Sequence, residues 1–179
     1  MPNELNTQPV YLTTGNPDTM NDAALYAGGQ LGERFAWRDR EYQIVRADSG
    51  ATSATATGAV AANQLAFWKD KDKLLVTNNS PQAVGGQVAN AYRNQVAGVF
   101  RTAVSAGYYC CILQKGDNIA VKNAGSGTIG QVLIANSGTA ADTTQIAVGS
   151  AFLYQVLGVE RASTSGGNVN ADLEIPGIP

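Results

Sequence analysis

Three glycines, Gly125, Gly127 and Gly130, have the G-x-G-x-x-G spacing of a dinucleotide-binding loop. Such a loop binds a pyrophosphate where a strand precedes it, a helix follows it and an acidic residue lies about 20 positions further on. Here the run 131–137 (QVLIANS) follows and has the composition of a strand, so no helix N-terminus would face a phosphate. The glycines are therefore interpreted as a hairpin loop, and no cofactor is expected.

The alternating run 69–73 (KDKDK) places Asp70 and Asp72 at the spacing of the first ligands of a calcium loop. The flanking lysines would repel a cation, and the glycine and terminal glutamate of a calcium loop are absent. The run is predicted to be the charged tip of a hairpin, which also discourages pairing with other strand edges. No metal site is expected.

Acid–base catalysis would depend on carboxylates, because the chain contains no histidine. The candidates are Asp39, Glu41, Asp48 and Asp117, all in turn-like contexts near Arg, Lys or Gly. Carboxylates in such turns are solvated, and no pattern places one of them in an apolar pocket that would raise its pKa. No catalytic residue is therefore expected, and the chain is predicted not to be an enzyme.

Two adjacent cysteines, Cys110 and Cys111, lie inside the apolar run 108–113. Neighbours in a strand point to opposite faces, so one thiol is expected to pack inward and the other outward. A disulfide between them would be strained, and two thiols alone make no zinc site. Both are interpreted as small hydrophobic residues of a strand.

Two aromatic pairs, Phe67–Trp68 and Tyr108–Tyr109, are subject to the same alternation. One member of each pair must face the other side of its sheet. An outward aromatic side chain on a lightly charged surface is typical of protein interfaces. The pairs are therefore candidate contacts with a partner.

The composition limits the class of protein. A chain of 179 residues can form one domain that buries roughly 70% of its unfolded surface. Charged residues make up 15%, against about 25% in an ordinary soluble domain. With 12 basic and 14 acidic residues, the chain has no basic footprint for nucleic acid, and no run of about 18 apolar residues predicts a membrane span. Neither nucleic acid nor a membrane is expected as a partner.

Apolar residues at period two, separated by turn signals, predict an all-β body. Turns every 8 to 12 residues or so are typical of an antiparallel barrel or sandwich. The run 115–117 (KGD) is read as a turn between two strands, and 80–95 as a loop or weak helix. The predicted strands cover 35–37, 42–46, 65–68, 74–77, 96–104, 108–114, 118–122, 129–137, 143–149, 152–162 and 172–175.

Three regions are predicted along the chain. Residues 1–30 are polar and proline-containing, and form an extended arm that needs a surface to lie on. Within the arm, 18–27 could form a short helix capped by Asp18 and ended by two glycines. Residues 31–162 form the β-rich body, and 163–179 a C-terminal strand and tail.

Several sequence blocks resemble a group of small virion proteins of tailed bacteriophages. The resemblance covers about residues 35 to 162, in which VAGVF, then AGxY, an apolar strand and GD follow in order. The chain is similar to capsid decoration (cement) proteins. The blocks are REYQIVRADSGAT, GAVAANQLAFWKDK, LLVTNN, NQVAGVFRTAVSAGYYCCILQKGDNIAVK, GSGTIGQVLIANS and YQVLGVERA.

The resemblance implies a β-barrel or β-tulip-like body on the outer surface of the icosahedral head of a virion, made in the host cytoplasm. Its partners would be the major capsid protein and further copies of itself, commonly as a homotrimer. Extended termini would reach across neighbouring shell subunits, a role for residues 1–30 and 163–179. Such a protein stabilises the head and needs no active site.

Two other classes remain open. A head-fibre, tail or baseplate β-domain would contact the host, for instance through glycan bound by outward aromatic residues. A hydrolase without histidine would need two carboxylates about 5 to 10 Å apart in a cleft. Copy number per particle separates the first from a cement protein, and alanine substitution of the four carboxylates would test the second.

Overall fold

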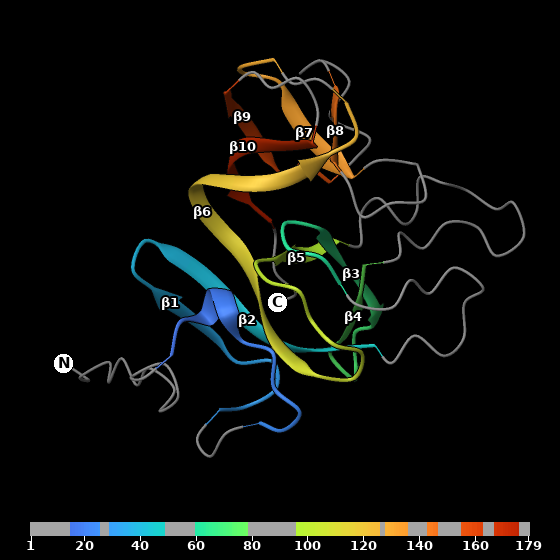
Figure 1. The fold of residues 1–179 in the computed structure, drawn as a ribbon. Coiled ribbons are helices and arrows are strands. Elements are labelled where there is room, and N and C mark those ends of the chain that lie inside the picture. Colours follow the sequence, from blue (N-terminus) through green and yellow to red (C-terminus); the bar gives the residue numbers. More distant parts are fainter. Residues whose placement is uncertain are drawn as a thin grey trace, which may run out of the picture.

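The computed structural model describes residues 15–25, 29–48, 60–78, 96–125, 128–135, 143–146, 155–162 and 167–175. Their regular secondary structure is almost entirely β, as predicted: ten strands join one sheet, preceded by a 3₁₀ turn (Figure 1). None of the described segments is a helix long and apolar enough to cross a bilayer. The elements are η2 (Pro17–Thr19), β1 (Arg34–Trp37), β2 (Arg40–Ala47), β3 (Leu65–Asp70), β4 (Leu75–Thr77), β5 (Val96–Phe100), β6 (Tyr109–Asn123), β7 (Val132–Ala135), β8 (Thr143–Ile146), β9 (Gly158–Ala162) and β10 (Gly167–Glu174).

Five strands close a first ring in the order β2-β4-β3-β5-β6, because β6 pairs again with β2. All of its pairs are antiparallel except β2–β4, where Arg46 and Ala47 lie beside Leu75 and Val76 in parallel. Strand directions cannot alternate all the way round a ring of five, so one parallel pair is required. The predicted antiparallel barrel is confirmed with this one exception in the ring.

A second set of pairings leads from β6 through β10, β9 and β7 to β8. The ring closes at Asn123 of β6, which lies beside Thr143 of β8 in parallel. The Thr143 hydroxyl donates to the Lys122 carbonyl at 3.1 Å, and the Ala124 N–H donates to the Thr143 carbonyl at 3.1 Å. In Figure 1, β6 runs between the two groups of strands, with β7 to β10 at its upper end.

The long strand β6 corrects the predicted turn at 115–117. On β10, Ala171 lies opposite Ile119 and Leu173 opposite Gly116, so β6 carries one extra residue, a β-bulge. Asn118 takes up a positive φ of 54°, and its N–H donates to the Asp172 carboxylate at 3.1 Å. Because β10 stays paired on both sides of the bulge, the Lys-Gly-Asp signal bends the strand and does not reverse it.

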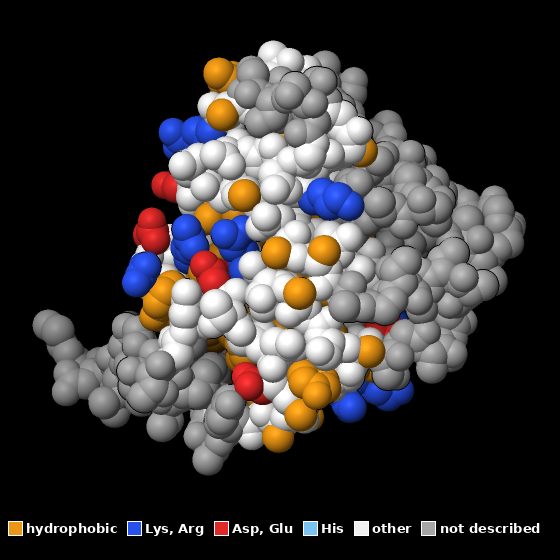
Figure 2. All heavy atoms as spheres, viewed as in Figure 1, with side chains coloured by type: hydrophobic (Ala, Val, Ile, Leu, Met, Phe, Trp, Pro, Cys, Tyr) orange, Lys and Arg blue, Asp and Glu red, His pale blue; other side chains and the backbone are white. Residues whose placement is uncertain are grey.

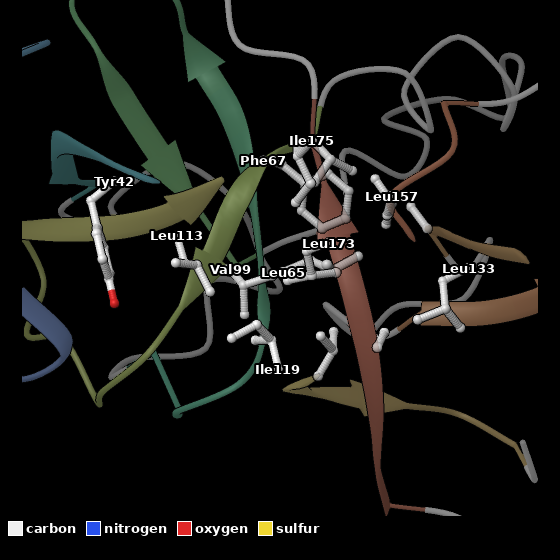
Figure 3. Close-up of a cluster of buried hydrophobic side chains, with 14 of the residues drawn as sticks. Tyr42, Leu65, Phe67, Val99, Leu113, Ile119, Leu133, Leu157, Leu173 and Ile175 are labelled. Carbon is white, nitrogen blue, oxygen red and sulfur yellow. The ribbon is translucent and has the colours of Figure 1, made fainter. Parts of the chain in front are cut away.

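The sheet has hydrophobic clusters on two faces. The inner cluster fills the first ring with residues from all five of its strands: Val45, Ala47, Ala66, Trp68, Val76, Ala97, Phe100, Cys110 and Ile112. The outer cluster covers the opposite face of these strands and continues into the second ring, with Tyr42, Leu65, Phe67, Val99, Leu113, Ile119, Leu133, Leu157 and Leu173 among its members (Figure 3). Strands of the first ring are therefore buried on both sides, which accounts for runs such as 96–100 that are buried throughout.

The N-terminal prediction is only partly correct. No helix follows Thr19 in the described residues up to Leu25; a three-residue 3₁₀ turn forms instead, and Asn16, not Asp18, caps it. Residues 16–22, here called the strap, lie on the body: Met20 is buried in the outer cluster, and Asp22 forms a β-bridge with Tyr109. Residues 1–14 of the predicted arm lie outside the described residues.

The C-terminal strand is longer than predicted. It begins at Gly167, not Asp172, and lies between β6 and β9. Val169, Ala171, Leu173 and Ile175 are buried in the outer cluster. Residues 167–175 are therefore part of the sheet, and this segment is not placed to reach across neighbours as the resemblance implied. The predictions for 49–59, 80–95 and 147–154 lie outside the described residues.

Candidate functional site

The glycine motif lies between two strands. Gly125 follows β6, Gly130 precedes β7, and Gly127 lies outside the described residues. Gly130 has a positive φ of 83°, and its N–H donates to the Glu160 carbonyl at 2.9 Å. A strand therefore follows the motif where a phosphate-binding loop would need a helix, as predicted.

The KDKDK run is the β3–β4 hairpin tip. Asp70 accepts from the Lys73 ammonium at 3.1 Å, and this lysine holds the pKa of Asp70 below its usual value. Lys69 pairs with Asp48. Among the described residues, no three His, Cys, Asp or Glu side chains come together in a way that could hold a metal ion.

The four candidate carboxylates are distributed over separate features. Asp39 is in the β1–β2 turn and Asp117 in the bulge of β6, while Glu41 lies 3.8 Å from the Lys115 ammonium and Asp48 faces Lys69. Two of them thus face a lysine. The structure describes no pairing of one of these carboxylates with another.

The Phe67–Trp68 pair corrects the prediction of an outward anchor. Phe67 is fully buried in the outer cluster and Trp68 is buried in the inner cluster. Tyr109 and Tyr108 divide in the same way but are only partly buried. The alternation is confirmed, yet both sheet faces are covered, so Trp68 does not reach the surface.

The two cysteines follow the same rule. Cys110 lies in the inner cluster and Cys111 in the outer cluster, where its sulfur is 3.4 Å from that of Met20. Both are free thiols and both are buried, so the expectation of one outward thiol is wrong. Burial raises the pKa of Cys110 to about 12 and raises the pKa of Cys111 as well.

Both thiols are therefore expected to resist labelling in the native protein. At pH 8 in Ellman's reagent, native protein should react at least about a thousandfold more slowly than protein unfolded in guanidinium, because labelling requires the small unfolded fraction. The measurement is the rate of absorbance change, with free cysteine as the control for reagent activity. Rapid modification of one thiol in folded protein would contradict the burial described here.

Three exposed apolar side chains lie along β7, β9 and the residues next to them. Ile129, Val156 and Val159 are the exposed large hydrophobic side chains of the described residues, at 64%, 38% and 44%. The β7–β9 hydrogen bonds, Gly130 N–H to Glu160 carbonyl and Leu157 N–H to Leu133 carbonyl at 2.9 Å each, space the three side chains along the strand pair, with Ile129 and Val156 near its opposite ends. Val159 also lies beside Val132 in the β7–β9 pair. We call these three residues the β7–β9 patch; Figure 2 shows hydrophobic side chains at the surface of this upper region.

A second group of polar side chains meets at the strap. The Asp18 carboxylate accepts from Arg40 Nη1 at 2.9 Å and from the Tyr42 hydroxyl at 2.8 Å. Arg101 Nε lies 3.5 Å from the same carboxylate. Burial raises the pKa of the Tyr42 phenol, and the hydrogen bond to Asp18 acts in the same direction, so this hydroxyl remains a donor at neutral pH.

Sequence reasoning identified neither of these groups. Asp18 meets Arg40 and Tyr42 across 22 and 24 positions of the chain, and no local pattern links such residues. For the patch a weak signal exists, since Ile129 is a β-branched residue beside the turn glycine Gly130. Both groups depend on long-range pairing of strands.

Comparisons with known proteins add a likeness to a solved structure. No protein-family model and no curated protein matches the sequence. The crystal structure of the N base of head fibre gp8.5 of bacteriophage phi29 is similar, with a TM-score of 0.44 and 15% sequence identity. The match covers 77% of this chain and 97% of that chain. A likeness at this level carries no argument about what this chain does.

Proposed function

We propose that this chain is a structural protein of a tailed-phage head that binds the outside of the capsid shell and strengthens it. The sequence blocks that resemble cement proteins support the proposal, and they coincide with β2 to β7 and β9 of the body. The major capsid protein is the expected partner, and several copies of this chain are expected to associate, as a trimer in the proposed form.

The observation that carries the proposal is the β7–β9 patch on a body whose other large hydrophobic side chains are, within the described ranges, at least partly buried. Three side chains cover much less area than the roughly 800 Å² that each partner buries in a standard stable interface. A contact of this size is weak alone but becomes effective when copies linked in one oligomer, as in the proposed trimer, bind neighbouring sites of a lattice. This is the binding mode that a shell-coating protein uses.

A negative charge on the patch is expected to remove the chain from particles. Val159→Asp would place a carboxylate in the apolar contact, and we expect at least a tenfold loss of copies per particle with little change in stability, because the side chain is already partly solvated. The measurement is quantitative mass spectrometry of purified virions. Ala36→Asp, an exposed position on β1, is the matched control.

If virions carry as many copies of the Val159→Asp chain as of the wild-type chain, the patch is not the contact with the shell. Complete absence of the wild-type chain from virions would overturn the proposed function itself. Particles that lack the chain should also release DNA at a lower temperature than particles that carry it.

A head fibre is the second candidate, with a role in host attachment. Copy number decides between the two: hundreds of copies per particle fit a cement protein, and a dozen or fewer fit a fibre or a tail component. The same mass-spectrometric count provides this number.

A further inference from the structure

The donors around Asp18 all belong to the body and not to the strap. Arg40 and Tyr42 lie on β2, and Arg101 follows β5 directly. Basic and acidic side chains lie next to one another on the face seen in Figure 2. The strap therefore contributes an acceptor to a set of donors that the body supplies.

Contacts within the body also hold two of these donors in place. Arg101 Nη1 donates to Asn63 Oδ1 at 2.8 Å and to the Ala120 carbonyl at 3.0 Å. Tyr42 is buried, with its ring stacked on Phe35 at 5.7 Å between centroids. These two donors keep their positions through contacts that do not involve the strap.

The geometry suits one class of acceptor. Arg40 contacts one oxygen of the Asp18 carboxylate, while Tyr42 and Arg101 approach the other. Two guanidinium groups and a phenol facing one group form a site for a planar anion with two oxygens. Without Asp18, two positive charges at 27% and 15% side-chain exposure would face each other.

We propose that Arg40, Tyr42 and Arg101 form a carboxylate-binding site that Asp18 occupies as an internal plug. The plug is an autoinhibitory contact: a carboxylate from another molecule enters only when the strap moves aside. The ligand class is a carboxylate, presented either by an acidic side chain of a partner polypeptide or by a small carboxylic acid. This inference does not depend on the proposed role in a phage head.

The test uses the full-length Asp18→Ala chain, in which the plug is removed. The probe is sodium formate, compared with sodium chloride at the same ionic strength. We expect formate to raise the melting temperature of this variant saturably and to shift the NMR signal of Arg101 Nε–H. The wild-type chain, with its site occupied, should need at least tenfold more formate for the same shift. Asp18→Ala combined with Arg101→Gln should lose the response.

Two peptides identify the source of the carboxylate. Acetyl-Pro-Asp-Thr-amide repeats the sequence of η2, and acetyl-Pro-Asn-Thr-amide is its neutral control. If the acidic peptide binds at a tenfold lower concentration than formate, the ligand is a polypeptide. If formate binds at the lower concentration, the ligand is a small carboxylic acid. Equal binding of the two peptides would count against recognition of the carboxylate.

The proposal is overturned if formate changes the melting temperature and the Arg101 Nε–H signal of Asp18→Ala no more than chloride does. The cluster would then be a structural ion pair only. If Asp18→Ala does not fold, competition in the wild-type chain replaces it. The Asp22 N–H donates to the Tyr109 carbonyl at 3.0 Å, and its hydrogen exchange should become several-fold faster in formate than in chloride. Unchanged exchange would then contradict a displaceable plug.

Discussion

Alanine in place of Gly158 is expected to destabilise the second ring severely. Gly158 is buried where β9 pairs with β10, and a Cβ there would meet the Asp172 carbonyl oxygen, its carbon at 2.9 Å and Leu173 Cα at 3.1 Å. All three are backbone atoms of the paired strand, so relief requires separation of β9 from β10. Overpacking commonly costs 1–3 kcal/mol, and we expect about 3 kcal/mol or more here. Guanidinium unfolding followed by circular dichroism measures the loss.

A matched glycine provides the control for this change. Among the described residues, no heavy atom lies within 4 Å of the position that a Cβ would take at Gly125, so Gly125→Ala should change the free energy of unfolding by less than about 0.5 kcal/mol. Hydrogen exchange should locate the Gly158→Ala effect in β9 and β10, with a smaller effect in β3 and β4. Equal stability of the two variants would show that β9 and β10 are not packed as described.

The hairpins were predictable because their signals are local. In the β1–β2 hairpin, period-two aromatic residues flank a polar turn, and the structure stacks Phe35 and Tyr42 on one face as expected. In the β3–β4 hairpin, alternating charges mark the tip and apolar residues mark both strands. In each case the partner strand is a few residues away, so sequence distance and spatial distance agree.

Longer-range features were missed for a physical reason. Whether Lys115–Asp117 reverses or merely bends the chain depends on whether β10 pairs with the residues on both sides of it. At this point β6 and β10 are more than 50 positions apart in the sequence, as the Asn118–Asp172 hydrogen bond across 54 positions shows. The burial of both Cys110 and Cys111 depends on a second layer that covers the outer face. Period two reports which face a side chain is on, but not whether that face meets solvent.

The full length of β10 was predictable from its sequence pattern. Residues 167–174 alternate Asn or Asp with Val169, Ala171 and Leu173, and the structure buries these three while their neighbours stay partly exposed. The polar partners and the two preceding glycines resemble a loop, which hides the period-two pattern. The proposed carboxylate site had no such signal, because Arg40 and Tyr42 lie on β2 while Arg101 follows β5 and Asp18 lies in the strap.

Replacement of Trp68 by alanine is expected to be the second large effect. Trp68 is only 4% exposed and packs in the inner cluster, whose members come from all five strands of the first ring. Truncation of a buried tryptophan removes its apolar contacts and leaves a cavity, at a typical cost of about 3–5 kcal/mol. If Trp68 were instead an outward anchor for a partner, the change would weaken binding and leave stability almost unchanged. Guanidinium unfolding of the isolated chain separates these two interpretations.

Trp37→Ala is the matched control, because Trp37 is only partly buried and Arg38 lies 4.2 Å from the centre of its ring. We expect this variant to lose less than half as much stability as Trp68→Ala, since its ring loses less buried surface. Should Trp68→Ala fail to fold, Trp68→Phe provides a milder change at the same site, with an expected loss of about 1–2 kcal/mol. The opposite result would be a Trp68→Phe chain that is as stable as the wild type and a Trp37→Ala chain that is less stable than Trp68→Phe. It would mean that the first ring is not packed around Trp68. Its closure by β2–β6 pairing would then lack the hydrophobic interior on which a ring of five short strands depends.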